Sequence, residues 1–299
     1  FLRARTNVNL TALAGALIVW DDSYVEAQAG YVDGEAATSI LVEADSSVIA
    51  DTSITLTALA GALTVTTRSS VTARKQSVTG VAGTNISVLD DSSVSGYTDV
   101  TLTAGDDLIV DSHDVGTASI TAETGNVLLR AGDNVYVSRT GLVTTLDGDY
   151  TAPGEQQNTL TIVGDYGDTD PEGAWILIEG RILGQNVEIS GQGDDDVIKL
   201  RQMVKLEGHT RILGLRGEDT VIIDRQPTLE TMHDRLADAS NGAVRDTIDI
   251  DGGSGSDTVV VYTHGSAAED RYDYIVNVLD TGAKNDGLDT LTIDGTDTV

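Results

Sequence analysis

The sequence predicts an all-β fold, a parallel β-solenoid whose coils are about 23 residues long and stack into a rod. A fixed period of this size is typical of repeat proteins in which each coil buries its apolar face only against its neighbours. The offsets within the repeat are even, which keeps its apolar side chains on one face of an extended chain. Two valine series carry the period: Val25, Val48, Val71 and Val94, and Val19, Val42, Val65 and Val88.

The composition agrees with a thin core of small side chains. The 299 residues include 32 glycines and three prolines. There are only one phenylalanine and two tryptophans, and there is no cysteine. So few aromatic side chains do not fill a broad globular core, whereas stacked β-branched side chains need none. The net charge of −30 repels nucleic acid and anionic lipid, so we expect neither as a partner. No apolar run approaches the roughly 20 residues of a membrane span, so we expect no membrane insertion.

Residues 1–150 form the regular part of the predicted solenoid, with about six coils. The segment Val8–Leu17 returns almost unchanged as Ile54–Leu63, and in shortened form as Val100–Leu108, a shift of 46 residues or two coils. The alternative for its Ala- and Leu-rich run is a short helix. The length of the run and its recurring glycine favour a strand followed by a bend.

Two polar columns accompany the valines of this first half. The charged column, three residues before each valine of the first series, is Asp22, Asp45, Arg68 and Asp91. Carboxylates stacked one coil apart repel by up to about 3.5 kcal/mol at an effective dielectric constant of about 20, and an intervening arginine relieves much of that repulsion. The alternative is that these side chains extend into water, where exposed pairs contribute little. The second column, which we interpret as a hydroxyl ladder in a turn, is Ser23, Ser46, Ser69 and Ser92.

Residues 151–299 form a less regular solenoid in which glycine–aspartate motifs precede strands. The segment Gly252–Val260 matches the nonapeptide G-G-x-G-x-D-x-U-x in full. Glycines permit tight turns with φ > 0 and expose backbone carbonyls, and the aspartate adds a carboxylate. Hard oxygen ligands at this spacing suit Ca²⁺, with neighbouring turns each supplying half of the coordination shell. Looser copies of the motif are Gly191–Val197, Gly214–Val221 and Asn285–Leu291.

At these motifs the sequence resembles the RTX family, the calcium-binding repeats of secreted bacterial toxins, proteases and giant adhesins. The resemblance implies an extracellular parallel β-roll with calcium between its turns. The chain departs from the family because its motifs lie 24 to 38 residues apart and do not follow one another directly; the spacing is measured between Gly193, Gly217, Gly255 and Gly287. The Asp-Thr-Val, Asp-Thr-Ile and Asp-Thr-Leu strand starts are similar to those of long RTX-adhesin or haemagglutinin-like surface proteins, which have β-helical stalks.

The motifs name the candidate calcium ligands. In the full match these are Gly253, Gly255 and Asp257, together with the upstream Asp249 and Asp251. In the looser copies they are Asp195, Asp219 and Asp289. A separate acidic loop, which lacks the twelve-residue spacing and terminal glutamate of a helix–loop–helix calcium site, holds Asp165, Asp168 and Asp170. The alternative for every candidate is a plain glycine–aspartate or acidic turn.

One segment interrupts the β pattern, because Pro227–Gly242 carries apolar residues at helical spacing between an opening proline and a closing glycine. We expect a short amphipathic helix at about 228–241. It either provides a docking surface or lies on the solenoid as an insertion.

Catalysis is the main competing function, since parallel β-helices also carry polysaccharide lyases and hydrolases. Such reactions need carboxylates or basic groups that converge on one face. The nearest basic cluster is Lys199, Arg201, Lys205, His209 and Arg211. With 18 basic against 48 acidic residues the surface is poor for an anionic polymer, and the four histidines fit no metal or triad spacing. We therefore expect no catalytic residues.

The sequence thus predicts a non-enzymatic, extracellular segment of a giant bacterial surface or matrix protein, a rigid rod that calcium stabilises. Its expected partner is the remainder of the same polypeptide, because neither end carries a visible cap; fibre formation or another homo-oligomer is a further expectation. The alternative is a carbohydrate- or self-binding adhesin module. Alignment of surface aromatics on one flank would favour that alternative, and the candidates are Tyr24, Tyr31, Tyr97 and Trp175.

Overall fold

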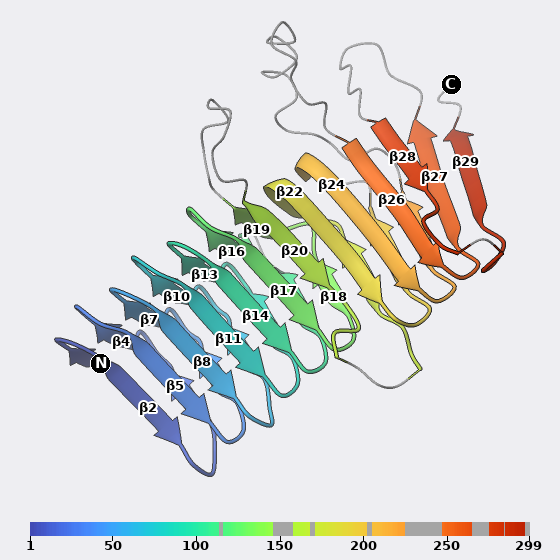
Figure 1. The fold of residues 1–299 in the computed structure, drawn as a ribbon. Coiled ribbons are helices and arrows are strands. Elements are labelled where there is room, and N and C mark those ends of the chain that lie inside the picture. The colour runs from blue at the N-terminus through green and yellow to red at the C-terminus, as the bar shows by residue number, and fades with distance from the viewer. Residues whose placement is uncertain are drawn as a thin grey trace, which may run out of the picture.

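The computed structural model describes residues 1–113, 116–145, 158–167, 171–201, 205–224, 247–264, 275–283 and 285–296. Within these ranges the regular elements are β-strands, and neighbouring strands pair in parallel. The strands stack into an elongated body with β1 (Leu2–Ala4) and β29 (Thr290–Thr296) at opposite ends (Figure 1). The predicted parallel β-solenoid is therefore confirmed.

Two sheets run along the stack, one with 18 strands, here called sheet 1, and one with 11 strands, here called sheet 2. In the earlier coils sheet 1 contributes two strands per coil. The first strands of these coils are β1, β4 (Tyr24–Ala27), β7 (Ser47–Ala50), β10 (Ser70–Ala73), β13 (Ser93–Gly96), β16 (Ala118–Ala122) and β19 (Gly141–Thr145). The second strands are β2 (Val8–Ala12), β5 (Val32–Ala36), β8 (Ile54–Ala58), β11 (Val78–Ala82), β14 (Val100–Ala104), β17 (Val127–Ala131) and β20 (Thr159–Val163).

Later coils carry one sheet 1 strand each, namely β22 (Arg181–Gln192), β24 (Lys205–Arg216), β26 (Thr247–Ser254) and β28 (Ile275–Leu279). Pairing is unbroken at the change, because β22 pairs with both β19 and β20. Sheet 2 consists of β3 (Leu17–Val19), β6 (Ile40–Val42), β9 (Leu63–Val65), β12 (Ile86–Leu89), β15 (Leu108–Asp111), β18 (Val135–Val137), β21 (Trp175–Ile178), β23 (Val197–Leu200), β25 (Thr220–Ile223), β27 (Thr258–His264) and β29.

The valine period is a vertical file through the stack. Val25 pairs with Val48, Val48 with Val71, and Val71 with Val94, each step spanning 23 residues. The file continues beyond the exact repeat through Ile120, Val143 and Ile182. Side chains that occupy the same place in successive coils therefore pack on one another about 4.8 Å apart.

Strand alternation explains why these residues form the core. In β8, β14, β16 and β17 buried and half-buried residues alternate, with Val, Ile, Leu and Ala inside and mostly Ser and Thr outside. Burial of each large aliphatic side chain contributes roughly 1.5–3 kcal/mol. Because a coil has only neighbouring coils to bury against, most of this stabilisation lies between coils and not within one.

The slower, 46-residue rhythm has a packing explanation. In one file large and small residues alternate: Leu10, Gly34, Leu56, Gly80 and Leu102 stack in that order. A Cβ added at Gly34 would lie 2.9 Å from Cδ2 of Leu56, and one at Gly80 would lie 2.7 Å from Cδ2 of Leu102. The glycines thus make room for leucines of adjacent coils. An apolar cavity of about 10 Å³ beside Gly80 marks the space that remains.

The charged column lies where the chain turns from sheet 2 to sheet 1. Asp22, Asp45, Arg68 and Asp91 each have φ between 54° and 61°, a left-handed conformation that aspartate tolerates better than most residues. Arg68 pairs with Asp45 through two hydrogen bonds of 2.6 and 2.7 Å. The hydrogen bond from Arg68 lowers the pKa of Asp45. Since both side chains are exposed to water, the pair adds little stability.

The expected helix at 228–241 lies outside the described residues. No described segment is a helix long and apolar enough to cross a membrane.

Replacement of Leu102 by alanine tests the stacked core. Leu102 is 1 % exposed and already borders the cavity at Gly80, so the truncation enlarges an apolar void. We expect Leu102→Ala to lower the free energy of unfolding by about 2–5 kcal/mol, measured by urea titration. The control is Thr103→Ala on the outer face of β14, which should change it by less than about 0.5 kcal/mol. Equal effects of the two changes would contradict the assignment of inside and outside.

Candidate functional site

The serine column shows how the solenoid satisfies backbone groups at its corners. The backbone N–H of Ser23 donates to Oγ of Ser46 at 3.2 Å, that of Ser46 to Oγ of Ser69 at 3.1 Å, and that of Ser69 to Oγ of Ser92 at 3.0 Å. Ser46, Ser69 and Ser92 are at most 1 % exposed. These buried N–H groups cannot reach water, so a hydroxyl oxygen of the next coil serves as their hydrogen-bond acceptor.

Aspartates repeat this bonding pattern in the second half, before the sheet 2 strands. The N–H of Asp196 donates to Oδ1 of Asp219 at 2.9 Å, that of Asp219 to Oδ1 of Asp257 at 2.9 Å, and that of Asp257 to Oδ1 of Asp289 at 3.0 Å. We call these four residues the aspartate column. It begins with the N–H of Ala174, which donates to Oδ1 of Asp196 at 2.6 Å.

The aspartate column differs from the serine column in what it buries. Asp196 and Asp219 are each 1 % exposed, and Asp257 is 4 % exposed. A carboxylate has a second oxygen, and Oδ2 of Asp196 and of Asp219 finds no hydrogen-bond partner in the part of the chain that the structure describes. Leaving such an atom unpaired inside a protein is costly, so these two oxygens need a physical explanation.

Glycines leave the space that the second carboxylate oxygens occupy. A Cβ at Gly191, Gly214 or Gly252 would collide with Oδ2 of the aspartate five residues later in the same coil. The requirement for glycine therefore comes from a buried carboxylate that rests on the backbone. The residue pairs are Gly191 and Asp196, Gly214 and Asp219, and Gly252 and Asp257.

Burial dominates the electrostatics of the column. It raises the pKa of Asp196 to about 7, with a further contribution from the carboxylate of Asp165, although the N–H of Ala174 acts in the opposite direction. Burial likewise raises the pKa of Asp219 to about 7, against the N–H of Asp196 and with added repulsion from Asp196 and Asp257. The pKa of Asp257 is raised for the same first reason. At coil spacing two ionised members would repel by up to about 3.5 kcal/mol at an effective dielectric constant of about 20.

The predicted ligands of the full motif have different contacts in the structure. Gly253 and Gly255 have φ of 93° and 138°, as the tight turn requires, and Asp257 points into the column. Asp249 lies on β26 beside Asn277 at 2.6 Å, and Asp251 accepts from the hydroxyl and N–H of Thr281. Asp249 and Asp251 thus accept hydrogen bonds from Asn277 and Thr281.

The other predicted ligands are also separated. Asp195 is exposed and accepts from the N–H of Glu218 at 2.8 Å, while Asp289 ends the column at the exposed last coil. Asp165 is buried and accepts from the N–H of Gly193 at 3.3 Å. Asp168 and Asp170 lie outside the described residues.

These positions bear on the calcium prediction. No group of three or more His, Asp or Glu side chains in the described ranges could hold a metal ion. In the aspartate column the Oδ1 atoms already accept backbone N–H groups. Backbone carbonyls of the motif are not side chains, so calcium at these turns stays a prediction of the sequence motif.

The basic cluster is divided between the two sheets. Lys199 lies on β23 of sheet 2 with its Nζ 3.5 Å from Asp224, whereas Arg211 lies on β24 of sheet 1. Arg201 forms an ion pair with Glu179, and Lys205 begins β24. His209 contacts Thr247 at 2.6 Å and Asp249 at 3.5 Å. Lys199 and Arg211 therefore lie on different sheets.

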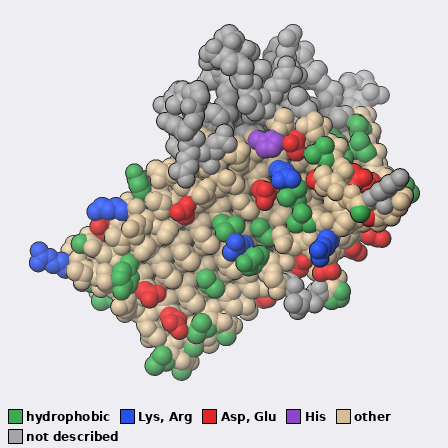
Figure 2. All heavy atoms as spheres, in the orientation of Figure 1, with side chains coloured by type: hydrophobic (Ala, Val, Ile, Leu, Met, Phe, Trp, Pro, Cys, Tyr) green, Lys and Arg blue, Asp and Glu red, His purple; other side chains and the backbone are tan. Residues whose placement is uncertain are grey.

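The aromatic candidates lie on both sheets or beside them. Tyr24 begins β4 of sheet 1, Tyr31 lies in the turn between β4 and β5, and Tyr97 lies in the equivalent turn between β13 and β14. Trp175 begins β21 of sheet 2, apart from the three tyrosines. On the face seen in Figure 2, charged side chains are also scattered and do not gather into one basic or acidic patch.

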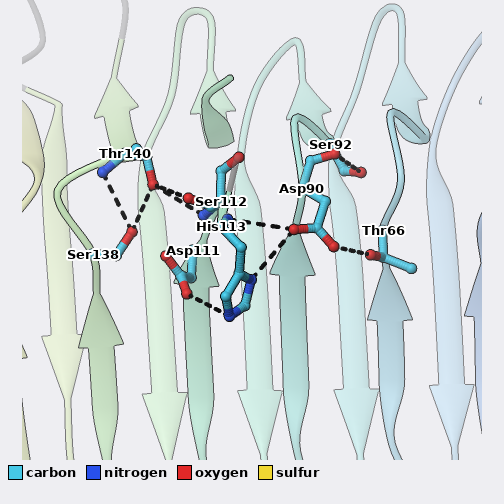
Figure 3. Close-up of polar contacts among 8 residues, drawn as sticks. All are labelled: Thr66, Asp90, Ser92, Asp111, Ser112, His113, Ser138 and Thr140. Atoms are coloured by element: carbon cyan, nitrogen blue, oxygen red, sulfur yellow. Dashed lines mark hydrogen bonds and ion pairs between the residues drawn. The ribbon is translucent and has the colours of Figure 1, made fainter. Parts of the chain in front are cut away.

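A polar cluster that contains His113 lies at the C-terminal ends of sheet 2 strands (Figure 3). Nδ1 of His113 lies 3.3 Å from Asp90, and Nε2 lies 3.4 Å from Asp111. Burial acts to raise the pKa of Asp90, but hydrogen bonds from Thr66 and His113 outweigh it and lower the pKa. Nearby hydroxyls bond to one another, with Ser138 Oγ 2.9 Å from Thr140 Oγ1. Both ring nitrogens of His113 thus contact carboxylates, and neither is paired with a serine of this cluster.

Asp196 is the residue that motif reading missed. The motif alignment selects Asp195, but the strand register places Val197 opposite Thr220, which puts Asp196 level with Asp219. A five-residue spacing from glycine to aspartate, common to all three buried pairs, is the signal in the sequence that could have found it.

No family model, curated protein or solved structure matches this chain.

Substitution of the glycine under Asp219 tests the architecture of the column. We expect Gly214→Ala to destabilise the fold by about 1–3 kcal/mol, because the added Cβ meets both Asp219 Oδ2 and the carbonyl oxygen of Gly252. The matched control is Gly193→Ala, where the nearest atom would be 3.8 Å away. Thermal unfolding of the two variants gives the comparison, and a larger loss at Gly193 would refute the assignment.

Proposed function

We propose that this chain is a stiff structural segment of a large extracellular bacterial surface protein. The observation that supports the proposal is the continuity of the stack: pairing runs from β1 to β28 through sheet 1 and from β3 to β29 through sheet 2. Eleven strands in sheet 2 give ten spacings of about 4.8 Å, or roughly 48 Å of rod.

Resistance to bending is the property that such a segment needs. Bending would stretch the backbone hydrogen bonds of one sheet, open the aliphatic files and separate the corner ladders at the same time. The acidic composition also suits such a segment, since a net charge of −30 makes neighbouring rods repel one another and keeps them soluble. Dispersed aromatics and a divided basic cluster give no comparable support to a binding module or a polysaccharide-active enzyme.

Immunogold electron microscopy on the producing cells tests the proposal. Antibody against the purified chain should label the outside of intact cells at a constant distance from the envelope. Deletion of the gene is the control and should abolish the label. Label confined to the cell interior, or hydrolysis of a polysaccharide panel by the purified chain, would contradict a surface structural role.

A further inference from the structure

Sheet 2 carries a file of outward-facing side chains along the whole stack. Each strand contributes the residue that stands between two inward-facing residues, as Ile109 stands between the buried Leu108 and Val110. The strand register places these residues in line in all eleven strands, and we call them the sheet 2 outer file. Its exposed or half-buried apolar members are Ile18, Leu41, Ile109, Tyr136, Ile222 and Val260.

The sheet 2 outer file contains no carboxylate, although the chain has a net charge of −30. Its one charged member is Lys199, whose Nζ lies 3.5 Å from a carboxylate oxygen of Asp224. By contrast, one outer file of sheet 1 includes Asp33, Glu188 and Asp249. A second rod that approaches along the sheet 2 outer file therefore meets no acidic side chain at the centre of the contact.

Both tryptophans of the chain lie beside this file. Trp20 is 60 % exposed and comes two residues after Ile18, so it faces outward on the same side. Trp175 is 51 % exposed and faces outward at the start of β21, two residues before Leu177, a buried member of the file. These side chains widen the file into a stripe, and an exposed apolar stripe of this kind marks an interaction surface.

We propose that two copies of this chain pair side by side through the outer faces of sheet 2. A partner has to match a straight, nearly uncharged stripe that runs the length of the rod, and the same stripe on a second copy provides that match. Two sheets with aligned strands pack face to face about 10 Å apart. A basic partner would instead be attracted to the acidic files. The pairing concerns the chain itself and does not depend on the surface role proposed above.

The size of the stripe suits such a pair. Its length is ten strand spacings of about 4.8 Å, or roughly 48 Å, and three outward residues on each strand span roughly 13 Å. The stripe therefore covers roughly 600 Å² on each copy and roughly 1,200 Å² in the pair, which is the lower limit of a standard specific interface. We accordingly expect a reversible association.

The net charge sets the direction of the salt effect. Two chains of net charge −30 repel one another at a distance, whereas the apolar contact acts only when the two faces touch. Raising the ionic strength from about 0.01 M to about 1 M shortens the screening length from about 30 Å to about 3 Å and removes most of that repulsion. Salt should therefore favour the pair, whereas it would weaken a contact held by opposite charges.

Sedimentation equilibrium of the purified chain at these two ionic strengths tests the pairing. At a chain concentration of about 0.1 mM we expect the mass of one chain at low salt and of two chains at high salt. Ile109→Glu places a carboxylate near the centre of the stripe and should raise the dissociation constant of the pair about tenfold or more. The matched control is Thr101→Glu, which adds the same charge to the outer face of sheet 1 in the same coil. It should change the dissociation constant by about twofold at most.

Tryptophan fluorescence of the unmodified chain gives a second readout that needs no variant to fold. Because Trp20 and Trp175 are exposed beside the stripe, pairing should shift their emission to shorter wavelength and reduce quenching by acrylamide as the chain concentration rises at high salt. A single-chain mass at both ionic strengths would overturn the proposal. So would a pair that salt dissociates, a pair that leaves the fluorescence unchanged, or equal weakening by Ile109→Glu and Thr101→Glu. A mass that grows beyond two chains would overturn it too, because the contact would then be end to end.

Discussion

Each coil of this chain can satisfy its backbone only through the next coil. Strands pair in register along both sheets, and at the corners a side-chain oxygen accepts the N–H that strand pairing leaves over. Because an unpaired buried N–H costs about as much as a lost hydrogen bond, one displaced coil would disturb both its neighbours. The core files follow the same register, so polar and apolar groups impose a single alignment.

The two polar columns lie at different corners of the coil. The serines stand where the chain turns from sheet 2 to sheet 1, and the aspartates stand where it turns from sheet 1 to sheet 2. Both accept the N–H of an adjacent coil, but an aspartate brings a second oxygen. Gly191, Gly214 and Gly252 accommodate that oxygen, which makes the glycine–aspartate spacing a consequence of packing. The motif that resembles a calcium-binding turn therefore also has a packing explanation in this chain.

The sequence predicted the regular half well, because a constant 23-residue step leaves no freedom in register: the file from Val25 to Val94 and the column from Asp22 to Asp91 follow from it. It predicted the second half less well. There the step from one sheet 2 strand to the next is 23, 38 and then 32 residues, so sequence spacing no longer identifies equivalent positions. Asp195 was selected in place of Asp196 because it stands two residues after Gly193, as Asp219 stands two residues after Gly217, although the strand register aligns Asp219 with Asp196. The Leu–Gly alternation was visible as a rhythm, but its cause required neighbouring coils in contact.

Distances between spin labels along one outer file test the stacking most directly, and the absence of cysteine allows labels to be placed at chosen sites. Thr55, Thr161 and Arg211 occupy a single file, with Thr161 four coils and Arg211 six coils from Thr55. The account predicts narrow distributions centred near 19 Å for Thr55 to Thr161 and near 29 Å for Thr55 to Arg211, at about 4.8 Å per coil. Broad distributions, or distances that do not grow with the number of coils, would contradict it.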